Sequence, residues 1–377
     1  MPLKIFISAG DPSGDIHAAR LMKKLKDKTG NNCTFIGIGG SKMKEEGLES
    51  LADIKEISVV GFWEVAKKYK FFSALLKRSK KLMKDNKTDI FIPVDYPGFN
   101  IKLASYARSI NIPVAYYIAP QLWAWGKNRA EKLVDAVNKV LVVFPFEVEH
   151  FQNYGLDTEF VGHPLLELPE FSKPVKSFEE RERTIAMLPG SRKQEIIRHM
   201  DLFIKIATYI QAERQDIKIK IARSDNVDTE HYLPDELEQK NIELSDNSIE
   251  LMQNSLAGIV KTGTSNLEAA LCGLPFVMTY KTSTFTYLLG KKLINLPYLS
   301  IINILHYRNI VDEFIQKDAT PQKIGNAILN FIDNKDEFDK IQNYMINIRE
   351  KLGNKIASEN AANSILKLLN YKNEAQT

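Results

Sequence analysis

Cysteine is scarce in this chain of 377 residues, and so are long hydrophobic runs and an excess of charge of one sign. The two cysteines, Cys33 and Cys272, lie inside apolar segments, which argues against a disulfide scaffold or a thiolate metal site and favours a reducing, cytosolic setting. No window approaches the roughly 18 apolar residues of a spanning helix, and the N-terminal apolar run is too short for a signal peptide. We expect a chain that does not cross a membrane, although it can rest on one.

The charge balance is nearly even, because 51 Lys and Arg face 47 Asp and Glu for a net charge of +4. So mild an excess does not indicate a nucleic-acid partner without a localised patch. A Walker A loop and a G-x-G-x-x-G fingerprint are also missing, so no ATP or dinucleotide site is implied. The chain is 44% apolar, as in ordinary globular proteins, and it is long enough for two domains.

Strand-like apolar runs alternate with amphipathic helical stretches, which is typical of βαβ units in parallel sheets covered by helices. The expected strands are Lys4–Ala9, Cys33–Gly39, Asp89–Val94, Pro113–Ala119, Lys139–Phe144, Thr158–Gly162, Thr184–Leu188, Ile217–Ala222, Ser255–Gly263 and Leu274–Tyr280. The series begins twice, and residues 167–183 between the two series have the composition of a linker. We expect two doubly wound α/β domains, 1–166 and 184–350, facing one cleft, with a C-terminal helix in 351–377 able to cross back to the first.

Two loops of the second domain suit an anion. Arg192 follows a strand and a Pro-Gly turn and lies where a helix starts, although a helix N-terminus is already positive. A bound anion held by backbone N–H groups and the guanidinium explains this placement, and an ordinary surface arginine is the alternative. In KTGTSNLEAALCGLP, residues 261–275, Gly263 and Thr264 expose donors at a second helix start, and Glu268 suits ribose hydroxyls. The two sites together predict a bound nucleoside diphosphate, with no DxD pair nearby to hold a metal.

The loops of the first domain offer a base and several polar groups. After the first strand, Ser13 or Asp15 can cap a helix whose first turns carry His17; a plain cap with a solvent-facing histidine is the alternative. In PVDYPGFN, residues 93–100, Asp95 follows an apolar strand and can act as a general base. Its alternative role is an Asx turn that organises the Pro-Gly corner.

Aromatic and basic residues gather in a third loop, residues 116–133, where Gln121, Trp123 and Arg129 lie close together in sequence. Aromatics beside cations suit stacking on a sugar or covering a phosphate. The alternative is that the tryptophans pack at a domain interface.

A basic amphipathic segment, Lys67–Lys87, carries nine basic residues and one acid. Phe72, Leu75 and Leu76 fall near one helical face, and Phe71 widens it. Such a pattern indicates a membrane-surface helix. The alternative is a covering helix whose apolar stripe faces the sheet.

Taken together, these motifs resemble the lipid-A-disaccharide synthase family of bacterial glycosyltransferases, which have the GT-B architecture. The resemblance runs from near the N-terminus to about residue 320. It includes the stretches SAGDPSGDIHAA, FIGIGGSKM, VVGFWEV, DYPGFN, APQLWAWGKNR, FPFE, FVGHPL, LPGSRKQE, TGTSNLEAAL, LPFVMTYK and INILHYRNIVDEFIQKDATP.

The resemblance implies an inverting transfer of 2,3-diacylglucosamine from its UDP derivative to 2,3-diacylglucosamine 1-phosphate, with no cofactor and no metal. It places the catalytic carboxylate on Asp95, assisted by Arg192, and has Gly98 where the family often carries a second Asp. The implied UDP-sugar contacts are Gly190, Ser191, Arg192, Gly263, Thr264, Glu268, Asn303, Glu313 and Gln316. The expected acceptor and cleft residues are Ser13, Asp15, His17, Gln121, Trp123 and Arg129. The implied membrane-facing residues are Phe62, Trp63, Phe71, Phe72, Leu75 and Leu76.

The resemblance further implies a peripheral enzyme on the cytoplasmic face of the inner membrane, as a monomer or a homodimer. Two alternatives stay open. One is another GT-B enzyme, such as a soluble UDP-sugar transferase or a UDP-N-acetylglucosamine 2-epimerase. The other is a membrane-surface protein that binds a sugar nucleotide without catalysis. A nucleic-acid binder is disfavoured, because the basic residues lie on an apolar-faced helix without a recognition motif.

Overall fold

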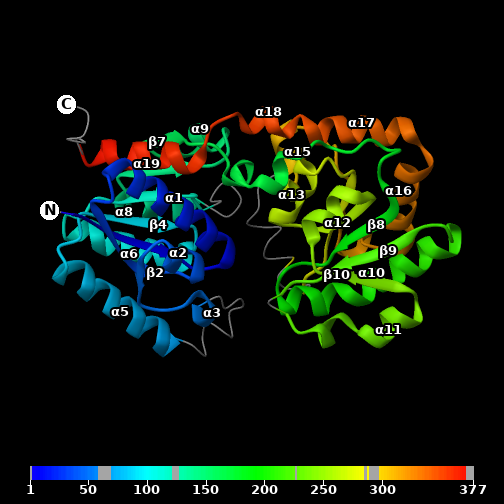
Figure 1. Cartoon of the computed structure of the whole chain (residues 1–377), viewed down its shortest axis with the longest axis horizontal. Coiled ribbons are helices and arrows are strands. Elements are labelled where there is room, and N and C mark those ends of the chain that lie inside the picture. The colour runs from blue at the N-terminus through cyan, green and yellow to red at the C-terminus, as the bar shows by residue number, and fades with distance from the viewer. Residues whose placement is uncertain are drawn as a thin grey trace. The chain divides into compact units, whose positions relative to one another are not determined.

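The computed structural model describes residues 2–57, 69–120, 127–225, 227–283, 287 and 297–370, and for Lys55 and residues 127–131 it describes the backbone alone. The chain divides into two units (Figure 1). Unit 1 is Met1–Glu167 with Leu352–Thr377, and unit 2 is Leu168–Lys351. Each contains a parallel sheet whose strand order reverses near its middle, so the predicted pair of doubly wound α/β domains is confirmed.

Unit 1 is built on a seven-stranded sheet in the order β3-β2-β1-β4-β5-β6-β7. Its strands are β1 (Leu3–Ala9), β2 (Cys33–Ile38), β3 (Leu48–Ser50), β4 (Ile90–Val94), β5 (Ala115–Tyr117), β6 (Lys139–Val142) and β7 (Thr158–Phe160). Its helices are α1 (Pro12–Thr29), α2 (Ser41–Glu45), α3 (Ile54–Ile57), α5 (Tyr69–Asp85), α6 (Pro97–Ser109), α8 (Lys127–Ala136), α9 (Glu147–Gln152), the 3₁₀ turn η1 (Pro164–Glu167) and α19 (Ala357–Leu368).

The core of unit 1 lies on both faces of the sheet, because side chains alternate along each strand. Phe6 belongs to the core that includes residues of α5, α6 and α8, and it packs edge-to-face on Phe91 at 5.7 Å. Ile5 and Ile7 belong to the opposite core, which α1 and α19 cover. The C-terminal helix α19 lies beside α1 (Figure 1), and the backbone N–H of Ser358 at its start donates to Glu167 at 2.8 Å.

Unit 2 is built on a six-stranded sheet in the order β10-β9-β8-β11-β12-β13. Its strands are β8 (Glu182–Leu188), β9 (Lys218–Ala222), β10 (Ile242–Ser245), β11 (Ser255–Lys261), β12 (Phe276–Tyr280) and β13 (Glu313–Ile315). Its helices are α10 (Lys193–Glu213), α11 (Pro234–Gln239), α12 (Ser248–Asn254), α13 (Thr264–Leu271), α15 (Ile301–His306), α16 (Pro321–Asp333), α17 (Lys335–Ile346) and α18 (Ile348–Leu352), with 3₁₀ turns η2 (Pro169–Ser172), η3 (Thr229–Tyr232) and η4 (Gln316–Asp318).

The segment expected to be a linker is packed into unit 2 from Leu168 onward. Phe171 is buried, and the guanidinium of Arg181, only 5% exposed, donates to backbone carbonyls around it. These carbonyls belong to Lys176, Met252, Gln253, Ser255, Cys272 and Gly273. The buried Arg181 guanidinium thus joins this segment by hydrogen bonds to the ends of a helix, a strand and a turn of unit 2. The segment is therefore part of the folded unit in spite of its polar composition.

The sequence pattern did not predict three short strands, which are β3, β10 and β13. All three are at sheet edges, where a strand is half exposed and carries a weak apolar signal. β3, for example, is only Leu48-Glu49-Ser50.

The basic helix α5 uses most of its apolar stripe for packing. Leu75 is buried, and Phe72 and Leu76 are partly buried against the unit 1 core. The covering-helix alternative therefore describes Leu75, whose assignment as membrane-facing is wrong, whereas the assignment of the partly buried Phe72 and Leu76 stays a prediction. Phe71 and Tyr69 remain exposed, whereas the expected membrane residues Phe62 and Trp63 lie outside the described residues.

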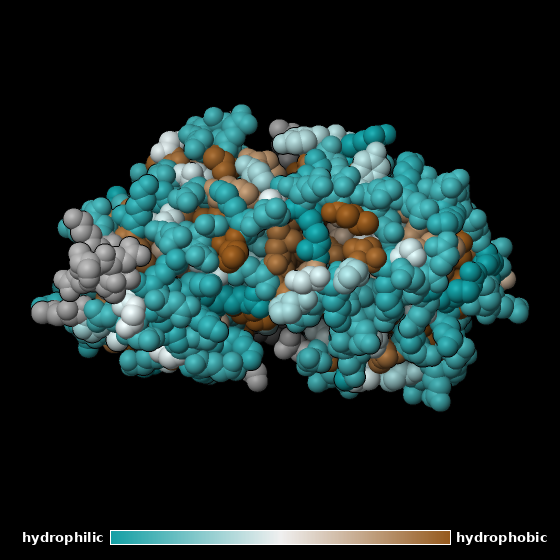
Figure 2. Space-filling model, turned by 45° about the horizontal axis from the view of Figure 1, so that its top comes forward, coloured by the Kyte–Doolittle hydropathy of each residue, from teal (hydrophilic) through white to brown (hydrophobic). Residues whose placement is uncertain are grey.

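No described helix is long and apolar enough to cross a bilayer. The face seen in Figure 2 is mostly hydrophilic, with hydrophobic residues in separate patches. Both cysteines are buried and free, Cys33 in unit 1 and Cys272 in unit 2.

Candidate functional site

Each sheet has a point at which the strand order reverses, and there the loops after two neighbouring strands diverge. In unit 1 it lies between β1 and β4, so the loops that follow Ala9 and Val94 flank it. In unit 2 it lies between β8 and β11, flanked by the loops after Leu188 and Lys261. Ligands of doubly wound proteins bind at such points, called switch points, outside the carboxyl ends of the strands. The sequence-predicted Asp95, Gly190–Arg192 and Gly263–Thr264 all lie in these loops.

The Asp95 turn in unit 1 is held in an unfavourable backbone conformation. Asp95 and Tyr96 have φ of 44° and 52°, and each non-glycine residue in the left-handed region costs on the order of 1 kcal/mol. The Asp95 carbonyl accepts hydrogen bonds from the buried Asn100 amide at 2.8 Å and from the Tyr116 hydroxyl at 2.7 Å. Two buried donors thus compensate for the strain and fix the turn that carries the carboxylate.

Asn100 also bonds the carbonyls of Ser8 and Val94, so it joins the ends of β1 and β4 to this turn. The Tyr96 ring lies against Gly10, where a Cβ would come within 2.2 Å of the ring. A larger residue at position 10 would therefore displace the turn. Burial and the nearby Asp95 charge raise the pKa of Tyr116 well above its usual value, which keeps this hydroxyl a donor.

Gly98, in the place of the family's second Asp, lies exposed in the first turn of α6. A Cβ there would meet nothing within 4 Å, and the first turn of α6 contains no acid. We expect Gly98→Asp to raise the free energy of unfolding by roughly 0.5 kcal/mol, because Asp favours a helix N-terminus and Gly is a poor helix former. Thermal denaturation measures this, with Gly98→Asn as the control because Asn has nearly the helix propensity of Asp without its charge. A Tm for Gly98→Asp no higher than that for Gly98→Asn would contradict the charge argument.

The cap of α1 is Asp11, and not Ser13 or Asp15 as the sequence suggested. The Asp11 carboxylate accepts the Gly14 N–H at 2.7 Å and the Ser13 hydroxyl at 3.1 Å. Asp15, 3% exposed, accepts N–H groups of Gly40, Lys42 and Met43 at 2.8–3.1 Å and so anchors the start of α2. With its carboxylate buried and engaged in this way, Asp15 is a structural residue, and its assignment to the acceptor cleft is corrected.

His17 is buried, contrary to the solvent-facing alternative. Burial, with a smaller effect of Arg20, lowers the pKa of its imidazole to about 4. His163, at the end of unit 1, is also buried, and burial with the nearby His17 lowers its pKa to about 3. Both rings are therefore neutral at pH 7.

The expected cleft residues Gln121 and Trp123 lie outside the described residues, as does the side chain of Arg129.

The two loops of unit 2 have the backbone that the sequence suggested. Gly190 and Gly263 have φ of 126° and 146°, values that other residues rarely adopt. Arg192 is the N-cap residue of α10, with its side chain 51% exposed, and Ser191 and Thr264 are exposed. Neither α10 nor α13 has a hydrogen bond from its N-cap side chain, and helix starts bind anions through their backbone N–H groups. On α13 the partly buried Glu268 has a pKa raised by burial.

Sequence reasoning missed three residues at this edge: Glu195, His199 and Lys261. Glu195 Oε1 lies 2.8 Å from Lys261 Nζ and 3.6 Å from an Arg192 nitrogen. His199 Nδ1 lies 2.7 Å from the Glu195 carbonyl, and its Nε2 accepts the Lys281 N–H at 3.1 Å. Lys261 is the first residue of the loop motif quoted above, but a lysine at the end of a strand does not by itself indicate a functional site. Its pairing with Glu195 of α10 arises only from the packing of the folded chain.

Residues 299–316, which include the expected UDP-sugar contacts Asn303, Glu313 and Gln316, are held together largely by hydrogen bonds from their own side chains. Asn303, which is fully buried, accepts the N–H groups of Ile310 and Val311 and donates to Glu313 at 2.9 Å. Glu313 accepts the Leu299 and Ser300 N–H groups, and Gln316 bonds the Thr282 backbone in both directions. These three side chains thus fix the backbone of residues 299–316, and their contact with a UDP-sugar stays a prediction.

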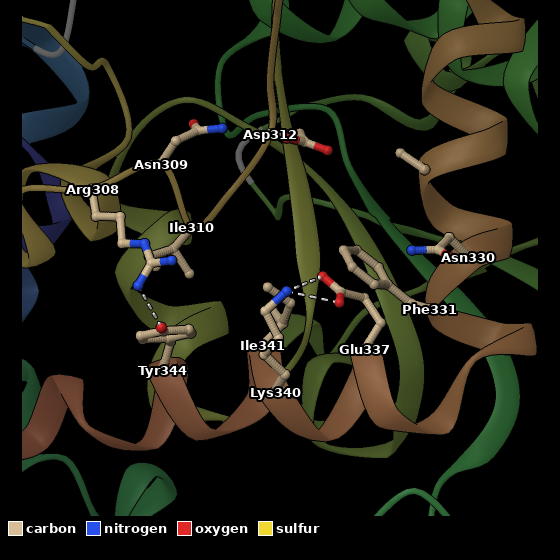
Figure 3. A pocket seen from close by; sticks show the side chains of 11 residues that line it. Arg308, Asn309, Ile310, Asp312, Asn330, Phe331, Glu337, Lys340, Ile341 and Tyr344 are labelled. Atoms are coloured by element: carbon tan, nitrogen blue, oxygen red, sulfur yellow. Dashed lines mark hydrogen bonds and ion pairs between the residues drawn. The ribbon is translucent and has the colours of Figure 1, made fainter.

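A hollow of about 180 Å³ in unit 2 lies away from this edge (Figure 3). Its lining includes Arg308, which donates to the Tyr344 hydroxyl, and the ion pair of Lys340 with Glu337. Residues 308–312 precede β13, so the hollow is at the amino end of that strand. Ligands of doubly wound sheets bind at the opposite end, and the hollow has no part in the function proposed below.

Two doubly wound parallel sheets, one in each unit, define a fold of the GT-B type. Solved structures agree in fold. A Staphylococcus aureus MnaA–UDP co-structure matches with a TM-score of 0.69 and 13% identity, covering 99% of this chain and 98% of that one. Acinetobacter baumannii MurG matches with a TM-score of 0.58 and 12% identity, covering 98% and 100%.

The family itself follows from sequence. The family model described as lipid-A-disaccharide synthetase matches residues 5–368. Lipid-A-disaccharide synthase of Persephonella marina is 33% identical over 97% of this chain and 99% of its own length. That of Sulfurihydrogenibium sp. is 35% identical over 97% and 98%. The chain belongs to the lipid-A-disaccharide synthase family of glycosyltransferases.

Proposed function

We propose that the chain transfers 2,3-diacylglucosamine from UDP-2,3-diacylglucosamine to 2,3-diacylglucosamine 1-phosphate, forming the β-1,6-linked disaccharide and UDP in lipid A biosynthesis. The observation that carries the proposal is the placement of Asp95 and of Gly190–Arg192 at the two switch points of a chain in this family. The epimerase alternative shares the fold, but the family match over nearly the whole chain favours the transferase.

In the proposed reaction, the Asp95 carboxylate takes the proton of the acceptor 6-hydroxyl. The freed oxygen attacks the anomeric carbon and forms the new C–O bond on the face opposite UDP, with inversion. The bond from the anomeric carbon to the phosphate oxygen breaks, and UDP leaves with the electron pair. The guanidinium of Arg192 and the N–H groups at Gly263 and Thr264 stabilise the charge that grows on the diphosphate.

The remaining site residues take supporting roles in this proposal. Gly190 and Ser191 offer N–H groups to the diphosphate, and Glu268 accepts from ribose hydroxyls. Ser13, His17, Gln121, Trp123 and Arg129 contact the acceptor. The enzyme binds peripherally at the cytoplasmic face of the inner membrane, where both lipids reside. The exposed Tyr69 and Phe71, and the lysines of α5, support such a contact.

The decisive experiment supplies both acylated sugars to the purified chain and detects disaccharide and UDP by mass spectrometry. Formation of both products in equal amounts is expected. UDP-N-acetylglucosamine, which lacks the two acyl chains of the lipid donor, serves as the control. Turnover or epimerisation of that compound alone would favour the epimerase alternative. Binding of the UDP-sugar without any product would favour the non-catalytic alternative.

Arg192→Ala should weaken UDP binding about tenfold or more, because it removes a charge-assisted contact to the diphosphate. Isothermal calorimetry measures the affinity. Arg214→Ala is the matched control, because Arg192 and Arg214 flank the two ends of the same helix α10 and only Arg192 is at the sheet's carboxyl edge. Unchanged UDP affinity in Arg192→Ala, or equal losses in both variants, would contradict the assignment.

A further inference from the structure

Lys261, the last residue of β11, has a side chain that is only 14% exposed, and its ammonium lies at the carboxyl edge of the sheet. Its partner is Glu195 at 2.8 Å, and it lies 5.6 Å from the centre of the Tyr280 ring. A lysine is costly to bury and is seldom held in this way without a role for its charge.

The Glu195 carboxylate lies where an anion bound at the start of α10 would lie. Its Oε1 contacts Lys261 and Arg192, and its Oε2 accepts the Ser191 N–H at 3.4 Å. A Cβ on Gly190 would come within 2.6 Å of Oε2, so the carboxylate rests directly on the glycine turn. A lysine, an arginine and a backbone N–H are the donors that a phosphate group takes at a helix N-terminus.

The charges at this edge do not cancel. Arg192 and Arg198 both lower the pKa of Lys261, secondary to burial, so the three cations lie within electrostatic reach of one another. Glu195 opposes that shift and is the carboxylate paired with Lys261. Among these four groups three positive charges lie near one negative charge, and the excess of positive charge suits the diphosphate of a nucleotide sugar.

We propose that Lys261 is a direct ligand of the donor diphosphate, and that Glu195 holds its ammonium in place until the diphosphate arrives and replaces the carboxylate. The proposal rests on the proposed function and adds a binding residue to it. Glu195 thus acts as a positioning residue that competes with the ligand for the same donors.

Calorimetry with UDP and with uridine tests this, because uridine lacks the diphosphate. Lys261→Met should lower UDP affinity about tenfold or more and leave uridine affinity unchanged, and Lys261→Arg should restore much of the loss. Glu195→Gln should raise UDP affinity several-fold, again without an effect on uridine, because the competing negative charge is gone.

The exposed pair of Lys205 with Asp201 is a matched control on the same helix, with a 2.7 Å contact away from the sheet edge. Lys205→Met and Asp201→Asn should leave both affinities at the wild-type value. Wild-type UDP affinity in Lys261→Met, or equal losses for UDP and uridine with a lower Tm, would overturn the proposal in favour of a structural ion pair. Failure of the wild-type chain to bind UDP would instead overturn the proposed function.

Discussion

Asp95→Asn should lower turnover about 100-fold or more while UDP affinity stays unchanged. The amide keeps the size of the side chain but cannot take the acceptor proton, and a general base contributes typically 10²-fold or more. The substitution leaves the side-chain amide of Asn100 and the hydroxyl of Tyr116 donating to the Asp95 carbonyl, so the turn itself should persist. Initial rates with both acylated substrates, and calorimetry with UDP, measure the two quantities separately.

Asp89→Asn is the matched control for this experiment. Asp89 precedes the same strand, β4, at its amino end, and its carboxylate accepts the Lys4 N–H at 2.7 Å. An amide oxygen can accept the same bond, so turnover should remain near wild type. Near-wild-type turnover in Asp95→Asn would show that another group takes the proton. A parallel fall in UDP affinity would instead point to a disturbed site.

Arg181→Met should lower the free energy of unfolding of unit 2 by about 3 kcal/mol or more. The guanidinium donates six hydrogen bonds to backbone carbonyls, and its loss leaves buried acceptors without a partner. Methionine fills much of the space but supplies no donor. Urea denaturation followed by far-UV circular dichroism measures the change, because all three tryptophans fall in unit 1 and their fluorescence would not follow unit 2.

Arg183→Met is the control, because Arg183 is two residues away and forms an exposed ion pair with Asp216 at 2.6 Å. Exposed pairs contribute at most about 1 kcal/mol, so its unfolding midpoint should shift little. If the two variants shifted the midpoint equally, the carbonyl cluster around Arg181 would not be the source of the stability that we assign to it.

The loops at the switch points were recognisable before any tertiary structure. Asp95, Gly190 and Gly263 each lie within two residues of the end of an apolar strand, and alternation of strands with helices places such positions at one sheet edge. The family resemblance then added the reaction. Short-range pattern was sufficient here because strand ends and glycine turns are local features.

Other features were inaccessible from local pattern. Asp15 looked like a helix cap, but its carboxylate anchors α2, 25 or more residues away. The stripe of α5 looked suited to a membrane until Leu75 proved buried. Residues 168–183 have linker composition, yet Arg181 is held in the core of unit 2. In each case an apolar or charged side chain has two possible surroundings, and only long-range packing chooses between them.

By itself the sequence determined the two series of alternating strands and helices and the loops in which we propose a base and a phosphate site, because these depend on residue type and spacing along the chain. The tertiary structure decided which charges meet. It set Glu195 between Lys261 and Arg192, and Asn100 beneath the Asp95 turn. Electrostatic and hydrogen-bond energies depend on distances through space. Glu195 and Lys261 are 66 positions apart in the sequence, so they come within hydrogen-bond distance only when the sheet forms.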